Sequence, residues 1–340
     1  MGMKETAYRE AQGAADAAPA QEALPADAMV NMHNARTDLA CEAGRAVAES
    51  HSRTEAVGGR PVTVSRSREA DGGRYVTISC GVITERDGED LTPLAAVLAG
   101  ELQALSALML GRAPGPDTKV LVAGLGNAHI TPDAVGPGTV SRMTVTRHLR
   151  TSHGELYRAL GCCELSALMP GVLGQTGIEA AELVKEAAVT VEADLVVAVD
   201  ALAARSCERL ASTVQLSDRG VAPGAGIGNR RLGLDRETVG CPVLALGVPT
   251  VVDSSTLVWD ALEKAGIGAD GVDPALRRVL ETGRQFIVSP RDCDRVVRLT
   301  CALLARALDM AFGVEMQPPE GGNGGNAESA EDTENAGGTF

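Results

Sequence analysis

Two aspartates follow apolar runs of the kind that form buried strands. Residues 120 to 123 are apolar, and the loop that follows them presents Asp133. Residues 194 to 199 form a second, largely apolar run, which stops at Asp200. In an open α/β sheet, ligands and reacting groups lie outside the carboxyl ends of the strands. The pattern therefore predicts that Asp133 and Asp200 lie in one cleft.

A close pair of carboxyl groups has a defined chemistry. Because two neighbouring carboxylates cannot both ionise cheaply, they share a proton. One carboxylate can then take a proton from water while the other carboxyl group protonates a carbonyl oxygen or a leaving amine. Each aspartate also has a structural interpretation, because Asp133 or Asp200 could cap a helix that follows it. Asp253, which ends the run 242 to 252, is a third candidate that the residues alone do not exclude.

The loop before Asp133 is rich in glycine. Gly124 and Gly126, together with Asn127, would shape a tight turn beside the aspartate. A dinucleotide fingerprint needs a third glycine where His129 stands, so the glycines do not predict a nucleotide site. A lone loop histidine is more often a hydrogen-bonding residue than a ligand, and no H-E-x-x-H spacing exists. The residues therefore favour neither a metal site nor a nucleotide site, and metal binding stays a minority hypothesis.

A second glycine-rich stretch, residues 220 to 231, suggests a different function. Its backbone amides could cradle an anion, with Arg230 and Arg231 close by. A plain surface loop explains the same pattern at least as well. The alternative that follows is a non-catalytic anion-binding module.

The rest of the chain alternates strand and helix patterns. We expect a hairpin over 60–67 and 74–80, strands over 118–123, 165–169, 194–199, 212–216 and 242–252, and helices over 92–110, 138–149, 178–188, 202–210 and 288–312. Another helix is expected after Asp253, capped by Ser254 or Ser255. This alternation predicts an α/β fold with a doubly wound, mostly parallel sheet and an N-terminal β-hairpin appendage.

Composition excludes several classes of protein. The net charge of −14 argues against direct nucleic-acid binding, which needs a basic surface. No stretch reaches the roughly 18 apolar residues of a membrane span, and no apolar signal core is present at the N-terminus. The 8 cysteines lack C-x-x-C spacing, as expected for reduced thiols in a cytosolic protein. A soluble intracellular protein is the expectation.

The motifs resemble those of the germination protease family of spore-forming bacteria. The resemblance runs through GLGNAHITPDAVGP, MPGVLGQTGIEAAELV, DLVVAVDALAARS, TVQLSDRGVAPGAGIGNRR and LGVPTVVD, in that order. The segment ARTDLACEA is similar to the family's RTDLA region, and VSPRDCD is similar to its C-terminal region. The joint order of these segments carries the resemblance, since no single motif is diagnostic.

The resemblance implies an atypical aspartic endopeptidase that initiates degradation of small acid-soluble spore proteins during germination. It implies catalytic roles for Asp133 and Asp200, and a fold similar to that of hydrogenase maturation peptidases. It also implies a zymogen that cleaves itself at the Asp38–Leu39 bond. This interpretation replaces the helix start, capped by Thr37, that the local pattern favours.

The same resemblance divides the chain into a propeptide (1–38) and an α/β peptidase domain (39–315), and the composition of residues 316–340 predicts a disordered low-complexity tail. The resemblance further implies a homotetramer without a cofactor, located in the cytoplasm of the forespore or spore core. A metal-sensing peptidase, like the hydrogenase maturation enzymes, is the alternative, and it needs an ion near Asp133.

Overall fold

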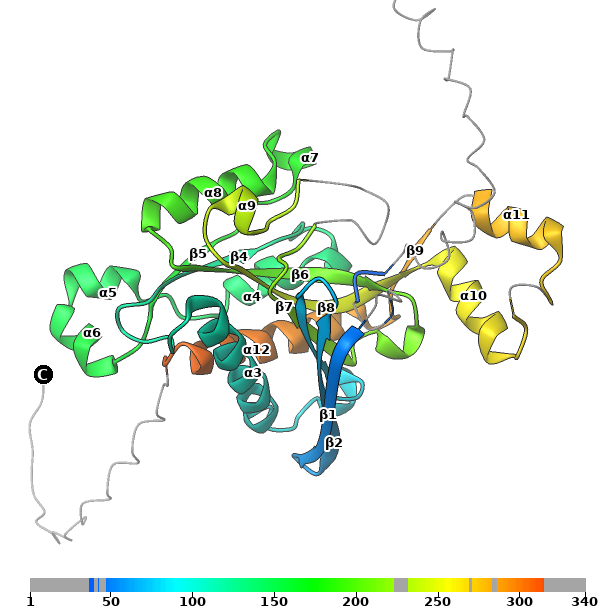
Figure 1. The fold of residues 1–340 in the computed structure, drawn as a ribbon, viewed down its shortest axis with the longest axis horizontal. Helices are drawn as coiled ribbons and strands as arrows, with labels where there is room; N and C mark the ends of the chain where they lie inside the picture. The colour runs from blue at the N-terminus through cyan, green and yellow to red at the C-terminus, as the bar shows by residue number, and fades with distance from the viewer. Residues whose placement is uncertain are drawn as a thin grey trace, which may run out of the picture.

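The computed structural model describes residues 37–39, 42, 47–222, 232–268, 271–282 and 286–314. The predicted propeptide before Thr37, the predicted tail 316–340, and Arg230 and Arg231 lie outside these residues. The described residues form helices packed around a central sheet (Figure 1). The α/β class predicted from the sequence is confirmed.

The strands of the described residues belong to one mixed sheet, in the order β1-β2-β3-β7-β8-β6-β4-β5, with β9 paired to β8. Strands β5, β4, β6 and β8 are parallel neighbours, and the remaining pairings are antiparallel. The expected parallel sheet is therefore one half of a larger mixed sheet. The strand bounds are β1 Val47–Val57, β2 Arg60–Glu69, β3 Arg74–Ser79, β4 Lys119–Gly124, β5 Glu164–Leu168, β6 Leu195–Ala204, β7 Thr213–Ser217, β8 Val243–Asp253 and β9 Ile287–Val288.

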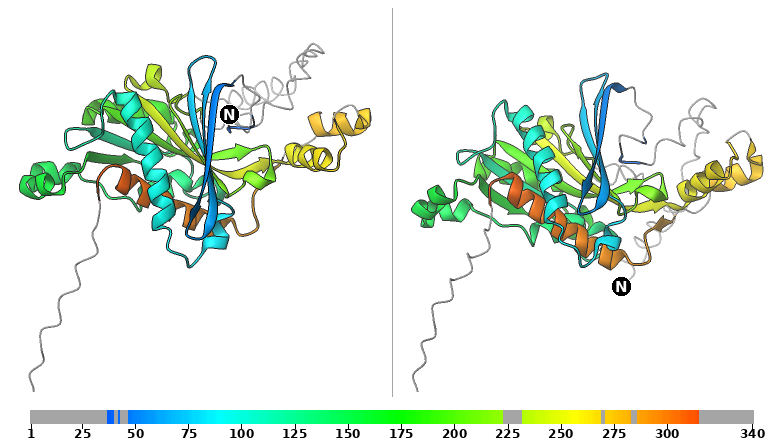
Figure 2. Two further views of the ribbon diagram at one scale, coloured as in Figure 1. Left: turned by 60° about the horizontal axis from the view of Figure 1, so that its bottom comes forward. Right: turned by 90° about the horizontal axis from the view of Figure 1, so that it is seen from below.

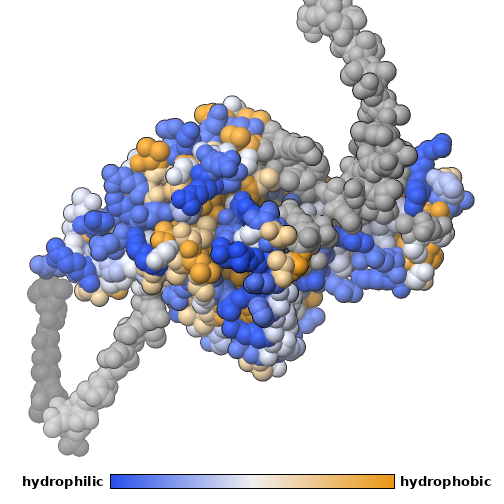
Figure 3. Space-filling view, in the orientation of Figure 1, coloured by the Kyte–Doolittle hydropathy of each residue, from blue (hydrophilic) through white to orange (hydrophobic). Residues whose placement is uncertain are grey.

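The predicted hairpin is present as β2 and β3, but it does not stand apart from the domain. Strand β3 pairs with β7, so the hairpin extends the same sheet. Strand β1 was missed because its residues before Val57 are exposed and show no apolar alternation. Hydrophilic residues cover much of the molecular face shown in Figure 3. The exposed residues of β1 include the charged Glu49 and Arg53. Such charges disfavour pairing of an open edge with another sheet.

Helices cover both faces of the sheet, as expected for a doubly wound fold. In β4, Val120 and Val122 face the layer of α3 and α12, whereas Leu121 and Ala123 face the layer of α8. Figure 2 shows α3 and α12 side by side on one face. The helix bounds are α3 Thr92–Leu110, α4 Val135–Val140, α5 Arg147–Ser152, α6 Gly154–Leu160, α7 Leu173–Thr176, α8 Ala180–Val191, α9 Arg236–Val239, α10 Ser254–Lys264, α11 Pro274–Thr282 and α12 Cys293–Ala311.

Among the helices of the described residues, α3 alone has the length and apolar composition to cross a membrane. Its side chains Leu94, Leu98 and Leu102 are almost completely buried in the main core. A core helix of a globular domain passes the same test, and the buried leucines of α3 belong to such a core.

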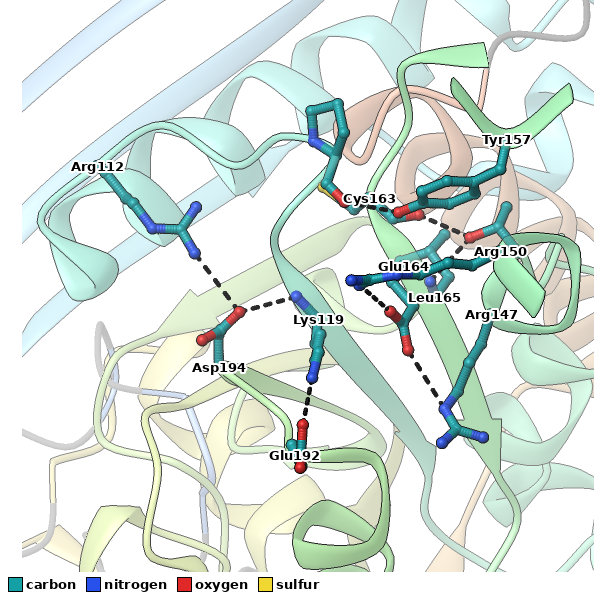
Figure 4. Close-up of polar contacts among 12 residues, drawn as sticks. Arg112, Lys119, Arg147, Arg150, Tyr157, Cys163, Glu164, Leu165, Glu192 and Asp194 are labelled. Atoms are coloured by element: carbon teal, nitrogen blue, oxygen red, sulfur yellow. Dashed lines mark hydrogen bonds and ion pairs between the residues drawn. The ribbon is translucent and has the colours of Figure 1, made fainter. Parts of the chain in front are cut away.

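The amino ends of the parallel strands are joined by paired charges (Figure 4). Asp194 accepts a hydrogen bond from the backbone nitrogen of Lys119 at 2.9 Å, and it pairs with Arg112. The buried carboxylate of Glu164 is shared by Arg147 and Arg150, at 3.3 and 2.6 Å. Ionic groups at this end therefore have structural partners, and the chemistry must be sought at the opposite, carboxyl end.

Several predicted helices differ from the structure. Residues 138–149 are not one helix, because α4 ends at Val140 and α5 begins at Arg147. Between the two helices, Thr146 is hydrogen-bonded to Leu165 of β5. The helix predicted over residues 202–210 is absent. Strand β6 continues to Ala204, and only a short 3-10 turn, Cys207–Arg209, follows. The last helix begins at Cys293 rather than near Ser289. Residues Pro274–Thr282, for which no helix was predicted, form α11.

Candidate active site

The loop after β4 is shaped by close backbone approaches. A β-carbon on Gly124 would lie 2.4 Å from the carbonyl oxygen of Gly136, so the start of α4 lies directly against the end of β4. Gly126 has a φ of +107°, which side chains with a β-carbon rarely adopt. These contacts fold the loop back over the strand and bring Asp133 to the carboxyl edge of the sheet.

The carboxylate of Asp133 closes this loop. Its Oδ2 accepts a hydrogen bond from the backbone nitrogen of Asn127 at 2.7 Å. The side-chain oxygen of Asn127 in turn accepts from the backbone nitrogen of His129 at 2.9 Å and from Nε2 of Gln175 at 2.8 Å. Asn127 thus joins the β4 loop to α7, and His129 is an exposed residue of the same turn.

Asp200 comes from the neighbouring strand, although not from its end. Gly124, the last residue of β4, is in register with Val199 of β6, so Asp200 lies just beyond the end of β4. Its side chain is 7% exposed, and its Oδ1 accepts a hydrogen bond from the nitrogen of Ala201 at 2.9 Å. The position at a strand end was wrong, but the adjacency of Asp200 to the end of β4 was predicted.

The electrostatic setting of both aspartates favours a bound proton. Burial raises the pKa of Asp133, against the hydrogen bond from Asn127, which lowers it. The pKa of Asp200 is raised well above its usual range, first by burial and then by the negative charges of Asp133 and Asp38. Two carboxyl groups that interact in this way titrate as a unit.

A third carboxylate enters the same cleft from the N-terminal segment. The backbone nitrogen of Asp38 donates to the carbonyl oxygen of Ala203 at 3.0 Å, and the nitrogen of Ala203 donates to Oδ2 of Asp38 at 2.8 Å. Leu39 is fully buried against Leu202 and Ala204. Asp38 therefore pairs with β6 instead of lying in the first turn of a helix capped by Thr37.

The cleft has the size and lining of a substrate site. Asp38, Asp133 and Asp200 line a cavity of about 490 Å³. Its walls are largely apolar, and the chain contributes to them from several segments: Ile130, Val172, Leu173, Leu232, Val251 and Ile287. A smaller cavity of about 270 Å³ shares Asp38 and Asp200 and continues across β7 and β8. Carboxyl groups in a mostly apolar cleft are typical of a reaction site.

The competing roles of the aspartates are resolved by their contacts. Asp253, and not Ser254 or Ser255, is the N-cap of α10, and it accepts from the nitrogen of Ser255 at 2.9 Å. On β8 the register partner of Asp200 is Gly247. Asp253 lies about 20 Å farther along this strand, at a rise of about 3.3 Å per residue. No helix follows Asp200, and Asp133 ends a 3-10 turn, so neither aspartate is a helix N-cap.

Other predicted sites receive less support from the described residues. Within the described residues, no three histidine, cysteine, aspartate or glutamate side chains are arranged so that they could hold one metal ion. Most of the glycine-rich stretch 220–231 lies outside the described residues, including Arg230 and Arg231. Its beginning is fixed by a bridge between Val221 and Leu234.

Two polar residues at the cleft were not identified from the sequence. Thr250 of β8 is fully buried and donates its hydroxyl hydrogen to the carbonyl oxygen of Pro132 at 2.7 Å, which anchors the Asp133 loop. Gln215 of β7 is 7% exposed and donates to the carbonyl oxygen of Asp38 at 3.0 Å. Thr250 is a polar residue within the largely apolar β8, and this was the available signal for it. Strand β7 alternates polar and apolar residues, so the pattern did not distinguish Gln215.

A family model and several known proteins are similar to this chain. The family model described as "Germination protease" matches residues 33–265. The germination protease of Caldanaerobacter subterraneus subsp. tengcongensis is 36% identical over 317 residues, which cover 84% of this chain and 96% of that protein. The germination protease of Bacillus subtilis is 40% identical over 253 residues, covering 69% and 67% of the two chains. That of Clostridium perfringens is 39% identical over 250 residues, covering 68% and 74%. The chain belongs to the germination protease family, and it is therefore a peptidase of spore germination.

Proposed function

We propose that Asp133 and Asp200 are the catalytic residues of this peptidase and that the chain is made as a zymogen that cleaves its own Asp38–Leu39 bond. The observation that carries the proposal is the position of segment 37–39. This segment is hydrogen-bonded to β6 as a substrate strand would be, and Asp38 lines the same cavity as Asp133 and Asp200. Residues 1–38 are then a propeptide, and 39–315 form the peptidase domain.

The chemistry follows from the shared proton of the two carboxyl groups. The ionised carboxylate takes a proton from water, and the water oxygen attacks the carbonyl carbon of the bond to be cleaved. The protonated carboxyl group supplies the proton that the leaving amine needs. Either aspartate can fill either role, because a coupled pair titrates as a unit. No metal or other cofactor takes part in this scheme.

We propose that the substrates are small acid-soluble spore proteins and that the enzyme acts in the spore core as a homotetramer. The support is family membership, together with a cleft whose apolar walls suit side chains of an extended protein segment. We also propose that the parallel half of the sheet is similar to that of the hydrogenase maturation peptidases. The metal-sensing alternative requires an ion near Asp133, and elemental analysis of the purified protein tests for one.

Intact-mass measurement tests the proposal. The full-length chain is incubated after mild acidification, and loss of residues 1–38 is followed with time. The same measurement is made on Asp133→Asn and Asp200→Asn, and circular dichroism verifies that both variants are folded. We expect cleavage between Asp38 and Leu39 in the unsubstituted chain and none in either variant. Cleavage at this bond by a folded variant at the unsubstituted rate would overturn the assignment.

A further inference from the structure

Asp200 and Gln215 occupy equivalent positions on either side of Gly247. Gly247 of β8 is in register with Asp200 of β6 and with Gln215 of β7. Residues in register point to the same face of a sheet, and next-nearest strands lie about 10 Å apart. Gly247 adds no side chain between them, and a β-carbon there would lie 2.6 Å from the side chain of Leu202. The side chain of Leu202 therefore lies over Gly247, on the face of the sheet that carries Asp200 and Gln215.

Segment 37–39 presents one backbone group to that amide. The carbonyl oxygen of Asp38 accepts a hydrogen bond from Nε2 of Gln215 at 3.0 Å. Because a carbonyl oxygen only accepts, the amide of Gln215 must present its nitrogen here. The backbone nitrogen and the carboxylate of Asp38 are both hydrogen-bonded to Ala203, so the residue that carries this carbonyl is fixed on β6. This carbonyl belongs to the Asp38–Leu39 bond.

We propose that Gln215 is a further catalytic residue, whose amide polarises the carbonyl of the bond to be cleaved and stabilises the charge that develops on its oxygen. This inference rests on the proposed self-cleavage at Asp38–Leu39. Donors already aimed at the site of developing charge stabilise a transition state without reorganising. Gln215 is 7% exposed, so little water competes for its N–H groups.

The step balances without any change in Gln215. The oxygen of a solvent water forms a bond to the carbonyl carbon of Asp38, and one carboxylate of the pair takes the proton of that water. The electrons of the C=O bond move to the oxygen that Gln215 holds. The C–N bond then breaks, the nitrogen of Leu39 takes a proton from the carboxyl pair, and a carboxyl group remains on Asp38. A protein substrate bound in place of segment 37–39 would present its carbonyl to the same donor.

The primary test compares two glutamines with the same kind of hydrogen bond. Gln103 of α3 donates its Nε2 hydrogen to the carbonyl oxygen of Ala311 at 3.0 Å, in the helical layer away from the cleft. In the full-length chain, we expect Gln215→Leu to slow cleavage at Asp38–Leu39 by about 10²-fold or more, the usual effect of removing one such donor. Gln103→Leu should lose a comparable hydrogen bond and cleave at the unsubstituted rate.

A second variant separates donation from shape. Gln215→Glu keeps the length of the side chain, and its carboxyl group donates a hydrogen bond only when protonated. Relative to the unsubstituted chain at each pH, its rate should recover as the pH falls, whereas the relative rate of Gln215→Leu should stay low. Equal pH dependence of the two variants would contradict the proposal.

A spectroscopic measurement gives an independent readout. In the uncleaved Asp133→Asn chain carrying ¹³C at aspartate carbonyls, the Asp38 signal is assigned by its loss in Asp38→Asn. Adding Gln215→Leu should move this signal upfield, as loss of a donor to a carbonyl does, and adding Gln103→Leu should leave it in place. An unmoved signal, or full-rate cleavage by folded Gln215→Leu, would overturn the role of Gln215 alone. Absence of cleavage in the unsubstituted chain would instead overturn the self-cleavage on which it rests.

Discussion

A β-carbon on Gly126 would lie 2.1 Å from the carbonyl oxygen of Asp133 and 2.9 Å from its Oδ1. No rotamer change relieves the first of these contacts, because it involves the backbone. The glycine therefore determines where Asp133 can stand. The same loop holds the carboxylate through the nitrogen of Asn127, so the shape of the backbone and the position of the Asp133 carboxylate are linked.

Gly126→Ala should reduce activity far more than its effect on folding suggests. The φ of +107° and the clash with Asp133 are expected to cost about 1–3 kcal/mol of unfolding free energy. Displacing a reacting group by about 1 Å can cost about 10²-fold in rate, and we expect a loss of that order. Denaturant unfolding and the rate of Asp38–Leu39 cleavage measure the two effects.

Gly111 supplies the matched control for that substitution. It ends α3 with a φ of +70°, and a β-carbon there meets no neighbouring atom. Gly111→Ala should cost roughly 1 kcal/mol from its left-handed conformation, with cleavage unchanged. If Gly111→Ala and Gly126→Ala lost the same activity, the hypothesis that Gly126 determines the position of Asp133 would be wrong.

Asp200→Asn should make the protein more stable at neutral pH. An aspartate in an unfolded chain has a pKa of about 3.9, and the folded protein raises the pKa of Asp200 well above this. The folded state then binds the proton more tightly than the unfolded chain does. The contribution of Asp200 to stability is therefore greatest below about pH 4, and it is lost as the pH rises through the folded pKa. Asparagine does not ionise and avoids this loss.

Thermal unfolding across pH checks the sign of this effect. The Tm of Asp200→Asn should exceed that of the unsubstituted chain at pH 7, and the difference should vanish below about pH 4. Intact mass must show that both chains are uncleaved before each scan. A variant that is less stable at pH 7 and more stable in acid would reverse the argument.

Asp38→Asn should shift the pH dependence of cleavage. The rate requires one proton on the carboxyl pair, so it falls when the pH rises past the raised pKa of Asp200. The charge of Asp38 contributes to raising this pKa, after burial and Asp133. Removing that charge should move the alkaline limb of the profile to lower pH, while the asparagine oxygen can still accept from Ala203. The measurement is the initial rate of self-cleavage as a function of pH. If the charge of Asp38 has no effect, the alkaline limb of this profile will stay at the same pH in the variant.

The parallel strands and the approach of Asp133 to Asp200 were predictable because they depend on local patterns. The apolar runs that form β4, β6 and β8 are buried on both sides, and such runs are visible in sequence. Glycine between an apolar run and an aspartate indicates a tight loop. Adjacent parallel strands have their carboxyl ends at the same edge of the sheet, so the approach of the two aspartates can be predicted without distant contacts.

The positions of Asp253, Gln215 and Asp38 depend on contacts between segments far apart in the chain. Asp253 has the same local pattern as Asp200, and only the register of β6 with β8 shows that it lies elsewhere. Gln215 acquires its partner because β7 enters the sheet beside β8. Strand β6 extends past Asp200 because Ala203 pairs with β8 and with Asp38, which overrides the helical preference of its alanines.

Asp253→Ala should lower stability and spare activity. Its carboxylate accepts from the nitrogens of Ser255 and Thr256 at the start of α10, and loss of such a cap costs about 1 kcal/mol. Asp253→Asn keeps an acceptor oxygen and should recover most of this stability. Both variants should cleave Asp38–Leu39 at the unsubstituted rate at a temperature where they are folded. Denaturant unfolding and intact mass make the comparison. A folded Asp253→Ala that cannot cleave would place Asp253, rather than Asp133 or Asp200, among the reacting carboxyl groups.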